Sequence, residues 1–329
     1  MRRSAESARR CARLALALAL ALLEQVSAAR AQDQAPRVDP APPLLVGEED
    51  ALGRAGLSVH QRIGEGVALF YTTAFPTAST RDGEAATTVI AGHVQLAPEL
   101  WIGVRVPVVA TRVEQPAGVR LDEAAWGNPE LYGEHQRVFG PPDRLHLRSI
   151  ARLALGLPLA EHGTASSLME NRALAIADAL AGWGERELYT PGVLPVTASG
   201  RVDAVLSPWV FSAGAKLPLL VRVSDADLPE ETTKRALGFA PLVEARATVW
   251  PWRSFGASLG GHVVIDALAA AEAPRRVGPG GIVQPALEPR LLFAIRSHFL
   301  LVADFVVPLG GPLGGGTNLA FGMHALAHL

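Results

Sequence analysis

The sequence predicts an all-β protein, a single antiparallel transmembrane β-barrel of about 12 strands that follows a cleaved signal peptide. Three observations predict this fold. The 329-residue chain begins with an export signal. No later stretch reaches the roughly 18 uncharged apolar residues expected of a membrane helix. The remainder alternates between apolar and polar residues, in runs longer than the strands of most soluble proteins.

Composition excludes several classes of function. The chain carries 30 basic and 32 acidic residues, so it lacks the basic excess of a nucleic-acid-binding surface. Apolar residues make up 49% and charged residues only 19%, which is too apolar for a disordered chain and unusually apolar for a soluble enzyme. The single cysteine excludes an internal disulfide or a cysteine-based metal cluster. We expect no cofactor and no bound metal.

Residues 1–31 have the organisation of a signal peptide. A Leu/Ala run from Leu14 to Leu23 is too short to span a bilayer, which needs about 20 residues. Ala29-Arg30-Ala31 fits the small-x-small cleavage pattern, and Val26-Ser27-Ala28 is a second candidate site. Cys11 precedes the apolar run, so it cannot be a lipoprotein cysteine. The basic region before the run contains Arg2, Arg3, Arg9, Arg10 and Arg13.

The rest of the chain is predicted to form two parts. Residues 32–56 contain four prolines and no clear period, which is typical of a flexible periplasmic lead-in. Residues 57–329 form the predicted barrel. Alternation alone also fits half-buried soluble strands, but runs of about 11 to 15 residues suit a tilted bilayer crossing. The runs are 63–75, 86–96, 100–112, 129–138, 145–159, 193–206, 209–223, 235–249, 254–267, 282–296, 299–308 and 317–329.

The connections between these runs alternate in length. Long connections are predicted at 76–85, 113–128, 160–192, 224–234, 268–281 and 309–316, and short ones lie between them. Outer-membrane barrels show this asymmetry, with tight periplasmic turns and longer external loops. A soluble sandwich has no reason to sort its loops in this way.

Aromatic residues gather near the short turns, where amphipathic rings favour the membrane interface. The predicted periplasmic aromatic girdle contains Trp101, Trp209, Trp250, Trp252 and Phe299. The alternative is that these rings are turn-proximal core residues.

Charged residues on the polar faces of the runs predict the lining of the barrel lumen. Basic residues outnumber acidic ones there, which suits either a narrow charged pathway or an interior filled by ion pairs. If Ile295 faces Phe299 across a short turn, Arg290 also faces Asp304. The lumen candidates are Arg105, Arg148, Arg152, Arg201, Asp203, Lys216, Arg246, Glu244, Asp266, Glu288, Arg290 and Asp304.

The longest connection, 160–192, is predicted to contain a short helix. Ser167 and Glu170 form a capping box, apolar residues follow at helical spacing, and Gly182 ends the pattern. This helix either folds into or over the pore mouth, or rests on the barrel rim.

A hydrolase is the weaker functional alternative. Some twelve-stranded outer-membrane barrels are lipases with a His–Ser pair on the lipid-facing surface. Ser149 interrupts an outward apolar face and His135 lies on the preceding run, so the pair has the residue types for acyl transfer. No third orienting group is evident, and we expect no catalytic residue.

Three segments resemble a known barrel family. They are Ala97 to Val108 after a short turn, Gly127-Asn128-Pro129-Glu130-Leu131 at the start of a run, and Leu153 to Leu159 before the long loop. The pattern is similar to that of the outer-membrane β-barrels named for a meta-pathway phenol-degradation protein, and of barrels described only as outer-membrane transporters. Where that family usually has Gly-Asp, this chain has Gly127-Asn128. The resemblance implies transport of small, apolar or aromatic, molecules.

The sequence therefore predicts a porin-like protein in the outer membrane of a Gram-negative bacterium, forming a narrow channel for passive passage of small molecules. A closed structural or adhesive barrel is the main alternative. The expected partners are outer-membrane lipid and lipopolysaccharide, the outer-membrane assembly machinery and a small-molecule solute, with no nucleic acid.

Overall fold

A computed structural model describes most of the chain beyond residue 54. The described residues are 55–68, 81–114, 120–140, 145–160, 174, 177–224, 233–234, 236–252, 254–267, 271–272, 283–295, 299–313 and 319–328. The predicted signal peptide and all but the last two residues of the predicted lead-in lie outside these ranges.

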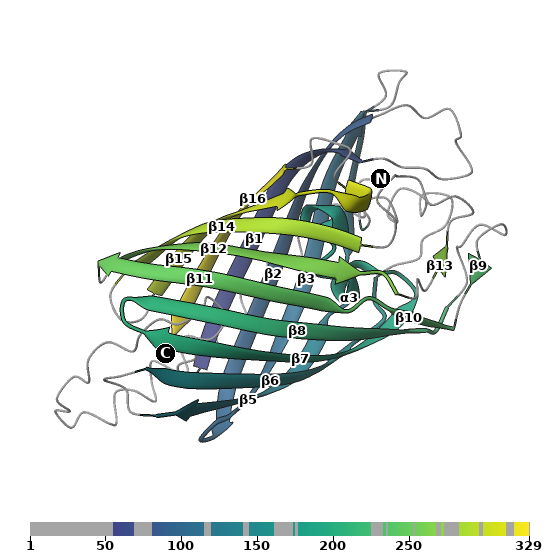
Figure 1. Cartoon of the computed structure of the whole chain (residues 1–329). Coiled ribbons are helices and arrows are strands. Elements are labelled where there is room, and N and C mark those ends of the chain that lie inside the picture. The colour runs from purple at the N-terminus through teal and green to yellow at the C-terminus, as the bar shows by residue number, and fades with distance from the viewer. Residues whose placement is uncertain are drawn as a thin grey trace, which may run out of the picture.

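The described chain forms one closed antiparallel barrel (Figure 1). Its sheet contains fourteen strands. We call each position around the barrel wall a stave; ten staves are single strands and two are each made of two consecutive strands. The barrel therefore has the twelve staves that the sequence predicts. The barrel closes where the first strand pairs with the last along ten consecutive residue pairs. The ten uninterrupted staves are β1 (Ala55–Ala68), β2 (Arg81–Ala97), β3 (Leu100–Glu114), β6 (His146–Gly156), β7 (Val193–Leu206), β8 (Trp209–Arg222), β12 (Phe255–Ile265), β14 (Val283–Ile295), β15 (Phe299–Pro308) and β16 (Leu319–His328).

Two staves are broken near a proline. β4 (Arg120–Trp126) and β5 (Glu130–Phe139) both pair with β3 and are separated by Gly127-Asn128-Pro129. β10 (Leu237–Phe239) and β11 (Leu242–Trp252) both pair with β8 on either side of Ala240-Pro241. Proline cannot donate a ladder hydrogen bond, which favours an interruption at these points. The fourth stave thus begins within the stretch predicted as a long loop, 113–128.

The first strand lies earlier in the chain than its prediction. The sequence places it at 63–75, whereas β1 begins at Ala55, inside the predicted lead-in. The polar residues His60, Gln61 and Arg62 fall in its middle and obscure the alternation. His60 and Arg62 lie on the inward side of β1, while Val59 and Ile63 lie on the outward side.

Alternation along the strands separates a polar interior from an apolar exterior. On β3, Arg105 lies on the inward side while Ile102 and Val104 are exposed. The same alternation occurs on β6, where Arg148 is buried and Leu147 and Leu153 are exposed. An apolar belt of this extent is stable when hydrocarbon, rather than water, surrounds it.

The two rims of the barrel differ. Pro98-Glu99 and Ser207-Pro208 form tight turns between consecutive strands at one rim, and the Ser207-Pro208 turn lies on the left of Figure 1. At the other rim most of the described strands are separated by longer stretches of chain, such as that between β6 and β7. The predicted alternation of connection lengths fails after β3, where only residues 115–119 precede β4, because β4 occupies part of the predicted long loop 113–128. Outside the barrel sheet, β9 (Thr233–Lys234) pairs with β13 (Ala271–Glu272), and η1 (Gly311–Leu313) follows β15.

The described residues contain two short helical stretches between β6 and β7, the second of which is α3 (Arg186–Tyr189). None of the helices in this part of the chain has the length and apolar character needed to cross a membrane.

Candidate functional site: the barrel lumen

The twelve predicted lumen residues all contribute to the barrel interior. Eleven lie on the strands, and Asp266 directly follows β12 at its outer end. Ion pairs join most of them to acidic or basic neighbours, and Glu244 lines the central cavity. These pairs include Arg105–Glu130 at 3.1 Å, Arg148–Asp203 at 2.7 Å, Arg152–Glu134 at 2.6 Å, Arg201–Asp203 at 2.9 Å, Arg246–Glu288 at 2.9 Å and Arg290–Glu288 at 2.6 Å.

The predicted register of the last strands is confirmed. Arg290 lies directly opposite Asp304, and Ile295 lies opposite Phe299. The ion pairs described for Asp304, however, are with β1: its carboxylate lies 3.1 Å from Nε2 of His60 and 3.5 Å from Arg62. Asp304 therefore helps to hold the closing seam of the barrel.

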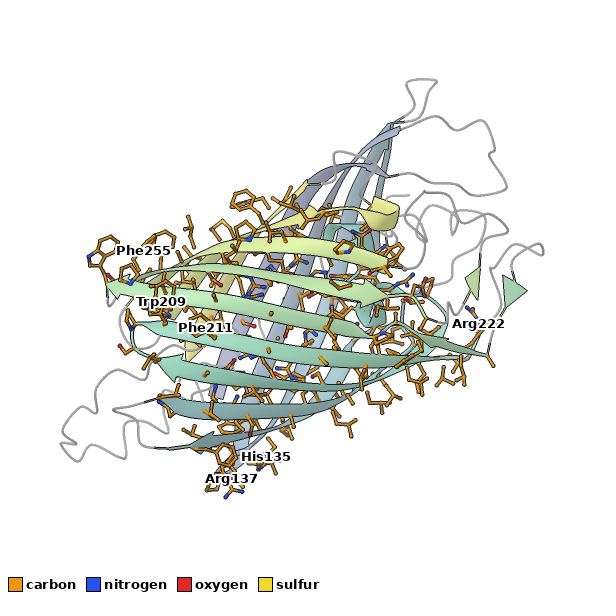
Figure 2. The ribbon with its side chains drawn as sticks, viewed as in Figure 1. His135, Arg137, Trp209, Phe211, Arg222 and Phe255 are labelled. Carbon is orange, nitrogen blue, oxygen red and sulfur yellow. The ribbon has the colours of Figure 1, made fainter. Side chains whose placement is uncertain are left out.

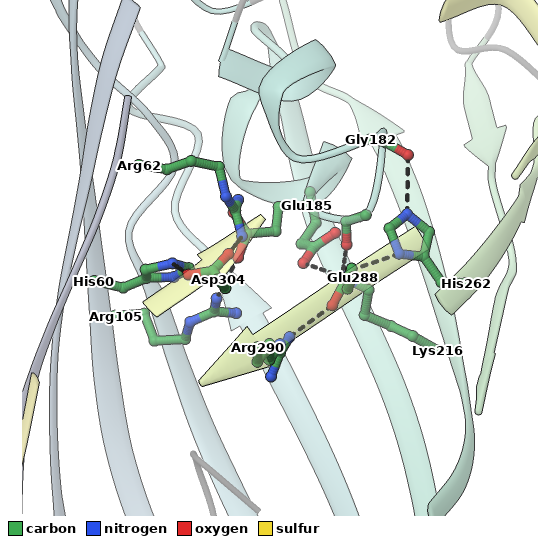
Figure 3. Close-up of polar contacts among 12 residues, drawn as sticks. His60, Arg62, Arg105, Gly182, Glu185, Lys216, His262, Glu288, Arg290 and Asp304 are labelled. Carbon is green, nitrogen blue, oxygen red and sulfur yellow. Dashed lines mark hydrogen bonds and ion pairs between the residues drawn. The ribbon is translucent and has the colours of Figure 1, made fainter. Parts of the chain in front are cut away.

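Residues 177–190, which we call the plug segment, fold inside the barrel (Figure 3). Helical residues 177–180 end at Gly182, whose φ of 59° is in the left-handed region that glycine adopts without strain. The Gly182 carbonyl accepts a hydrogen bond from Nε2 of His262 on β12 at 3.0 Å. The predicted helix within 160–192 thus enters the barrel rather than resting on its rim. Its predicted capping residues, Ser167 and Glu170, lie outside the described residues.

Two carboxylates of the plug segment contact basic residues of the wall. Glu185 lies 3.4 Å from Arg62 on β1 and 3.3 Å from Arg105 on β3. Glu187, only 1% exposed, lies 2.7 Å from Nζ of Lys216 on β8. Lys216 also donates a hydrogen bond to the Gly184 carbonyl. Three staves are therefore tied to the plug segment by charge-assisted hydrogen bonds.

Arg186 joins another part of the plug segment to the wall. Arg186 lies 3.3 Å from Asp178 within the segment and 3.0 Å from Asp266 of the wall. Its guanidinium also stacks over the ring of Trp183, at 4.7 Å from the centroid.

Asn128 connects the plug segment to the broken fourth stave. Its side-chain amide, fully buried, donates hydrogen bonds to the carbonyls of Glu187 at 3.0 Å and Thr190 at 2.8 Å. Its side-chain oxygen accepts one from the backbone of Ala160 at 3.0 Å. Asn128 lies in the interruption between β4 and β5, and from there its side chain binds both ends of the connection between β6 and β7.

Apolar packing supports the same end of the plug segment. Leu188 and Tyr189 of α3 belong to a fully buried cluster that also contains Leu174 and Ala177. The wall contributes Val89, Val109 and Ala125. The plug segment is thus part of the packed interior.

A cavity of about 180 Å³ remains in the lumen beside the plug segment. Charged and polar residues dominate its lining, as expected for a wetted interior. The basic residues that line it are Arg62, Arg105, Arg152, Arg201, Lys216 and Arg290, the acidic ones are Glu134, Glu185, Glu244 and Glu288, and the histidines are His60, His262 and His324.

Burial changes the acid–base behaviour of the plug segment. Burial raises the pKa of Asp178 to about 7, although Arg186 opposes the shift. Burial also raises the pKa of Glu187 against the opposing effect of Lys216. Burial acts to raise the pKa of Glu185 too, but Arg62 and Arg105 outweigh it and hold that pKa below its ordinary value.

These shifts predict a pH dependence of plug docking. An acid with a higher pKa when docked takes up a proton on docking, so docking weakens as pH rises through that pKa. Raising the pH from about 6 to about 8 should therefore favour release of the plug segment through Asp178, which faces Arg186, Asp266, Glu187 and Lys216. Protection of the plug-segment amides from hydrogen exchange should therefore fall over this window, and Asp178→Asn should flatten the profile. A wild-type protection that rises over this window would contradict the prediction.

The predicted aromatic girdle divides into two groups. Trp209, Trp252 and Phe299 are exposed on the outer surface at the short-turn rim, where Figure 2 also shows Phe211 and Phe255. Trp101 and Trp250 lie on the inward side instead. Trp101 is 8% exposed, and Trp250 packs against the buried cluster of Leu292, Leu300, Val302 and Leu326. These two residues are therefore core aromatics near a turn, which was the alternative. Each is an even number of positions from an inward charged residue on its own strand, Trp101 from Arg105 on β3 and Trp250 from Arg246 on β11, so it points to the same side.

The hydrolase alternative finds its two residues diagonal to each other across the β5–β6 hairpin, without a described contact between them. His135 is on the outer surface at 53% side-chain exposure, and its described ion pair is with Glu99 at 3.5 Å. Ser149 lies opposite Arg137, whereas His135 lies opposite Ala151, two positions further along β6. No hydrogen bond between Ser149 and His135 is found among the described residues.

Comparisons with known proteins support the barrel assignment at the level of fold. No family model and no curated protein sequence matches the chain. Among solved structures, an outer-membrane channel from Pseudomonas putida F1 is similar, with a TM-score of 0.58 at 10% identity, covering 88% of this chain and 99% of the other. The transport unit of the autotransporter AIDA-I from Escherichia coli (TM-score 0.48, 9% identity, 88% and 95% covered) and the NanC porin (0.43, 6%, 83% and 100%) are more distant. The chain therefore has the fold of an outer-membrane β-barrel.

Proposed function

We propose that this protein is an outer-membrane channel for the passive passage of small molecules, and that the plug segment closes it. The observation that carries the proposal is the character of the contact between plug and wall. Glu185, Glu187, Arg186 and Gly182 bind the wall through ion pairs and hydrogen bonds beside a polar cavity. Water and ions can replace these polar contacts of residues 182–187, while the buried apolar cluster around Ala177, Leu188 and Tyr189 keeps the ends of the plug segment anchored to the wall.

Several features of the sequence belong to the same proposal. Residues 1–31 act as the export signal, and residues 32–54 form a periplasmic lead-in to the barrel. The assembly machinery of the outer membrane inserts the barrel, and lipid and lipopolysaccharide surround it. The segments at 97–108, 127–131 and 153–159 support a relationship to the meta-pathway phenol-degradation type of barrel.

Planar-bilayer recording tests the channel. Purified full-length protein, folded and heat-modifiable in gel electrophoresis, should produce discrete conductance steps, and liposomes containing it should swell in small neutral sugars. Heat-denatured protein and detergent alone serve as controls. A folded barrel that gives neither steps nor swelling would overturn the proposal in favour of a closed structural or adhesive barrel.

A further inference from the structure

The plug segment supplies negative charge that the wall lacks. When the ion-pair partners of the cavity-lining wall residues are counted with them, eight residues are basic and six are acidic: Arg62, Arg105, Arg148, Arg152, Arg201, Lys216, Arg246 and Arg290 against Glu130, Glu134, Asp203, Glu244, Glu288 and Asp304. The plug segment carries three acidic residues and one basic residue, Asp178, Glu185 and Glu187 against Arg186. Removing the plug segment therefore leaves a positive excess around the cavity.

Lys216 depends most directly on this neutralisation. Its ammonium contacts the carboxylate of Glu187 at 2.7 Å and the carbonyl of Gly184, and both partners belong to the plug segment. The side chain is 21% exposed, so solvent covers little of the charge. When the plug segment leaves, this ammonium faces the wetted lumen without either partner, and another anion that reaches it can form the same charge-assisted hydrogen bond.

Arg62 and Arg105 extend the same site across the lumen. Each keeps a carboxylate of the wall, because Arg62 lies 3.5 Å from Asp304 and Arg105 lies 3.1 Å from Glu130. Each also directs a second guanidinium nitrogen to Glu185. A guanidinium has five donor groups, so these two arginines can bind a further carboxylate without giving up the first. Figure 3 shows Glu185 between Arg62 and Arg105, with Lys216 on another stave.

We propose that Arg62, Arg105 and Lys216 form a binding site for the carboxylate groups of a small organic anion, and that Glu185 and Glu187 occupy this site in the closed state. The inference rests on the proposed channel function and adds the chemical class of its solute. Solute and plug segment compete for the same donors, so a carboxylate that enters the cavity also displaces the closing element. Carboxylate is the class that the structure indicates, because carboxylates occupy these donors in the closed state.

Succinate is a suitable probe because it carries two carboxylates, and its neutral diamide, succinamide, is a matched control. Calorimetry on the detergent-solubilised full chain should show saturable succinate binding at constant ionic strength and none of succinamide. Lys216→Gln should weaken succinate binding by roughly tenfold or more, because it removes a charge-assisted hydrogen bond. Arg137→Gln is the matched control, since that guanidinium lies on the outer surface over the ring of Phe139.

A second variant separates binding from loss of folding. Glu187→Gln removes the competing carboxylate and should strengthen succinate binding, a result that a misfolded protein cannot give. In bilayers, succinate should raise the opening frequency of the wild type relative to chloride at equal ionic strength. Absence of saturable binding, or equal binding by wild type and Lys216→Gln, would overturn the inference even if the channel conducts. Binding without any conductance would instead overturn the channel and leave the site in place.

Discussion

Oxidation of a cysteine pair introduced by Gly182→Cys and Ala286→Cys is expected to abolish channel opening, and reduction to restore it. A Cβ atom placed on Gly182 would lie 3.1 Å from Cβ of Ala286 on β14. Disulfides join Cβ atoms about 3.5–4.5 Å apart, so a shift of a few tenths of an ångström accommodates the bond. The bond would tie the turn of the plug segment to the wall, and closure would no longer depend on the reversible contacts of Glu185 and Glu187. The measurement is opening frequency in planar bilayers before and after adding reductant.

The single variants provide the controls for this experiment. Gly182 has a φ of 59°, so Gly182→Cys introduces strain of about 1 kcal/mol whether or not a disulfide forms. That variant alone should open at least as often as the wild type and should not respond to reductant. Cys11, the only native cysteine, lies in the proposed signal peptide, so no other thiol competes in the mature chain. Undiminished opening of the oxidised double variant would show that the plug segment is not the gate.

The sequence predicts the barrel because its main determinant is local. One face of each strand meets lipid and the other meets the polar interior, so the two environments impose a period of two on strands such as β6 and β15. The prediction was wrong where a second influence acts on a strand. On β1 the inward residues His60 and Arg62 serve the closing seam and the plug segment, and the outward Gln61 between them is also polar, so the alternation is lost there.

The site was less accessible to prediction because the plug segment joins residues that are distant in sequence. Glu185 and Arg62 are separated by 123 positions, and no local period relates them. Two signals were available: the helix predicted within 160–192, and the excess of basic over acidic lumen candidates, since a buried cation requires a counter-charge. Glu185 and Glu187 of this longest connection supply part of the counter-charge, in addition to wall carboxylates such as Glu130 and Glu134. Asn128 gave no signal, because its role arises only from the break in the fourth stave.

The same reasoning about buried charge predicts that Asp203→Asn causes a large loss of stability. Asp203 is fully buried on β7, and both of its carboxylate oxygens are used. Oδ2 accepts hydrogen bonds from Nε and Nη2 of Arg148 at 3.0 and 2.7 Å, and Oδ1 accepts one from Nε of Arg201 at 2.9 Å. Asparagine keeps the shape but removes the negative charge between two guanidinium groups. Removing one member of a buried ionic network costs about 3–5 kcal/mol.

Urea unfolding in lipid vesicles, followed by tryptophan fluorescence, measures this loss. Glu99→Gln is the matched control, since it also exchanges a carboxylate for an amide and also removes an ion pair, the one with His135 at 3.5 Å. Both members of that pair are about half exposed, so its loss should change the free energy of unfolding by less than about 1 kcal/mol. The difference between the variants isolates the effect of burial, because the chemical change is the same. Equal destabilisation by the two substitutions would mean that the ion pairs of the interior contribute no more to stability than those at the rim.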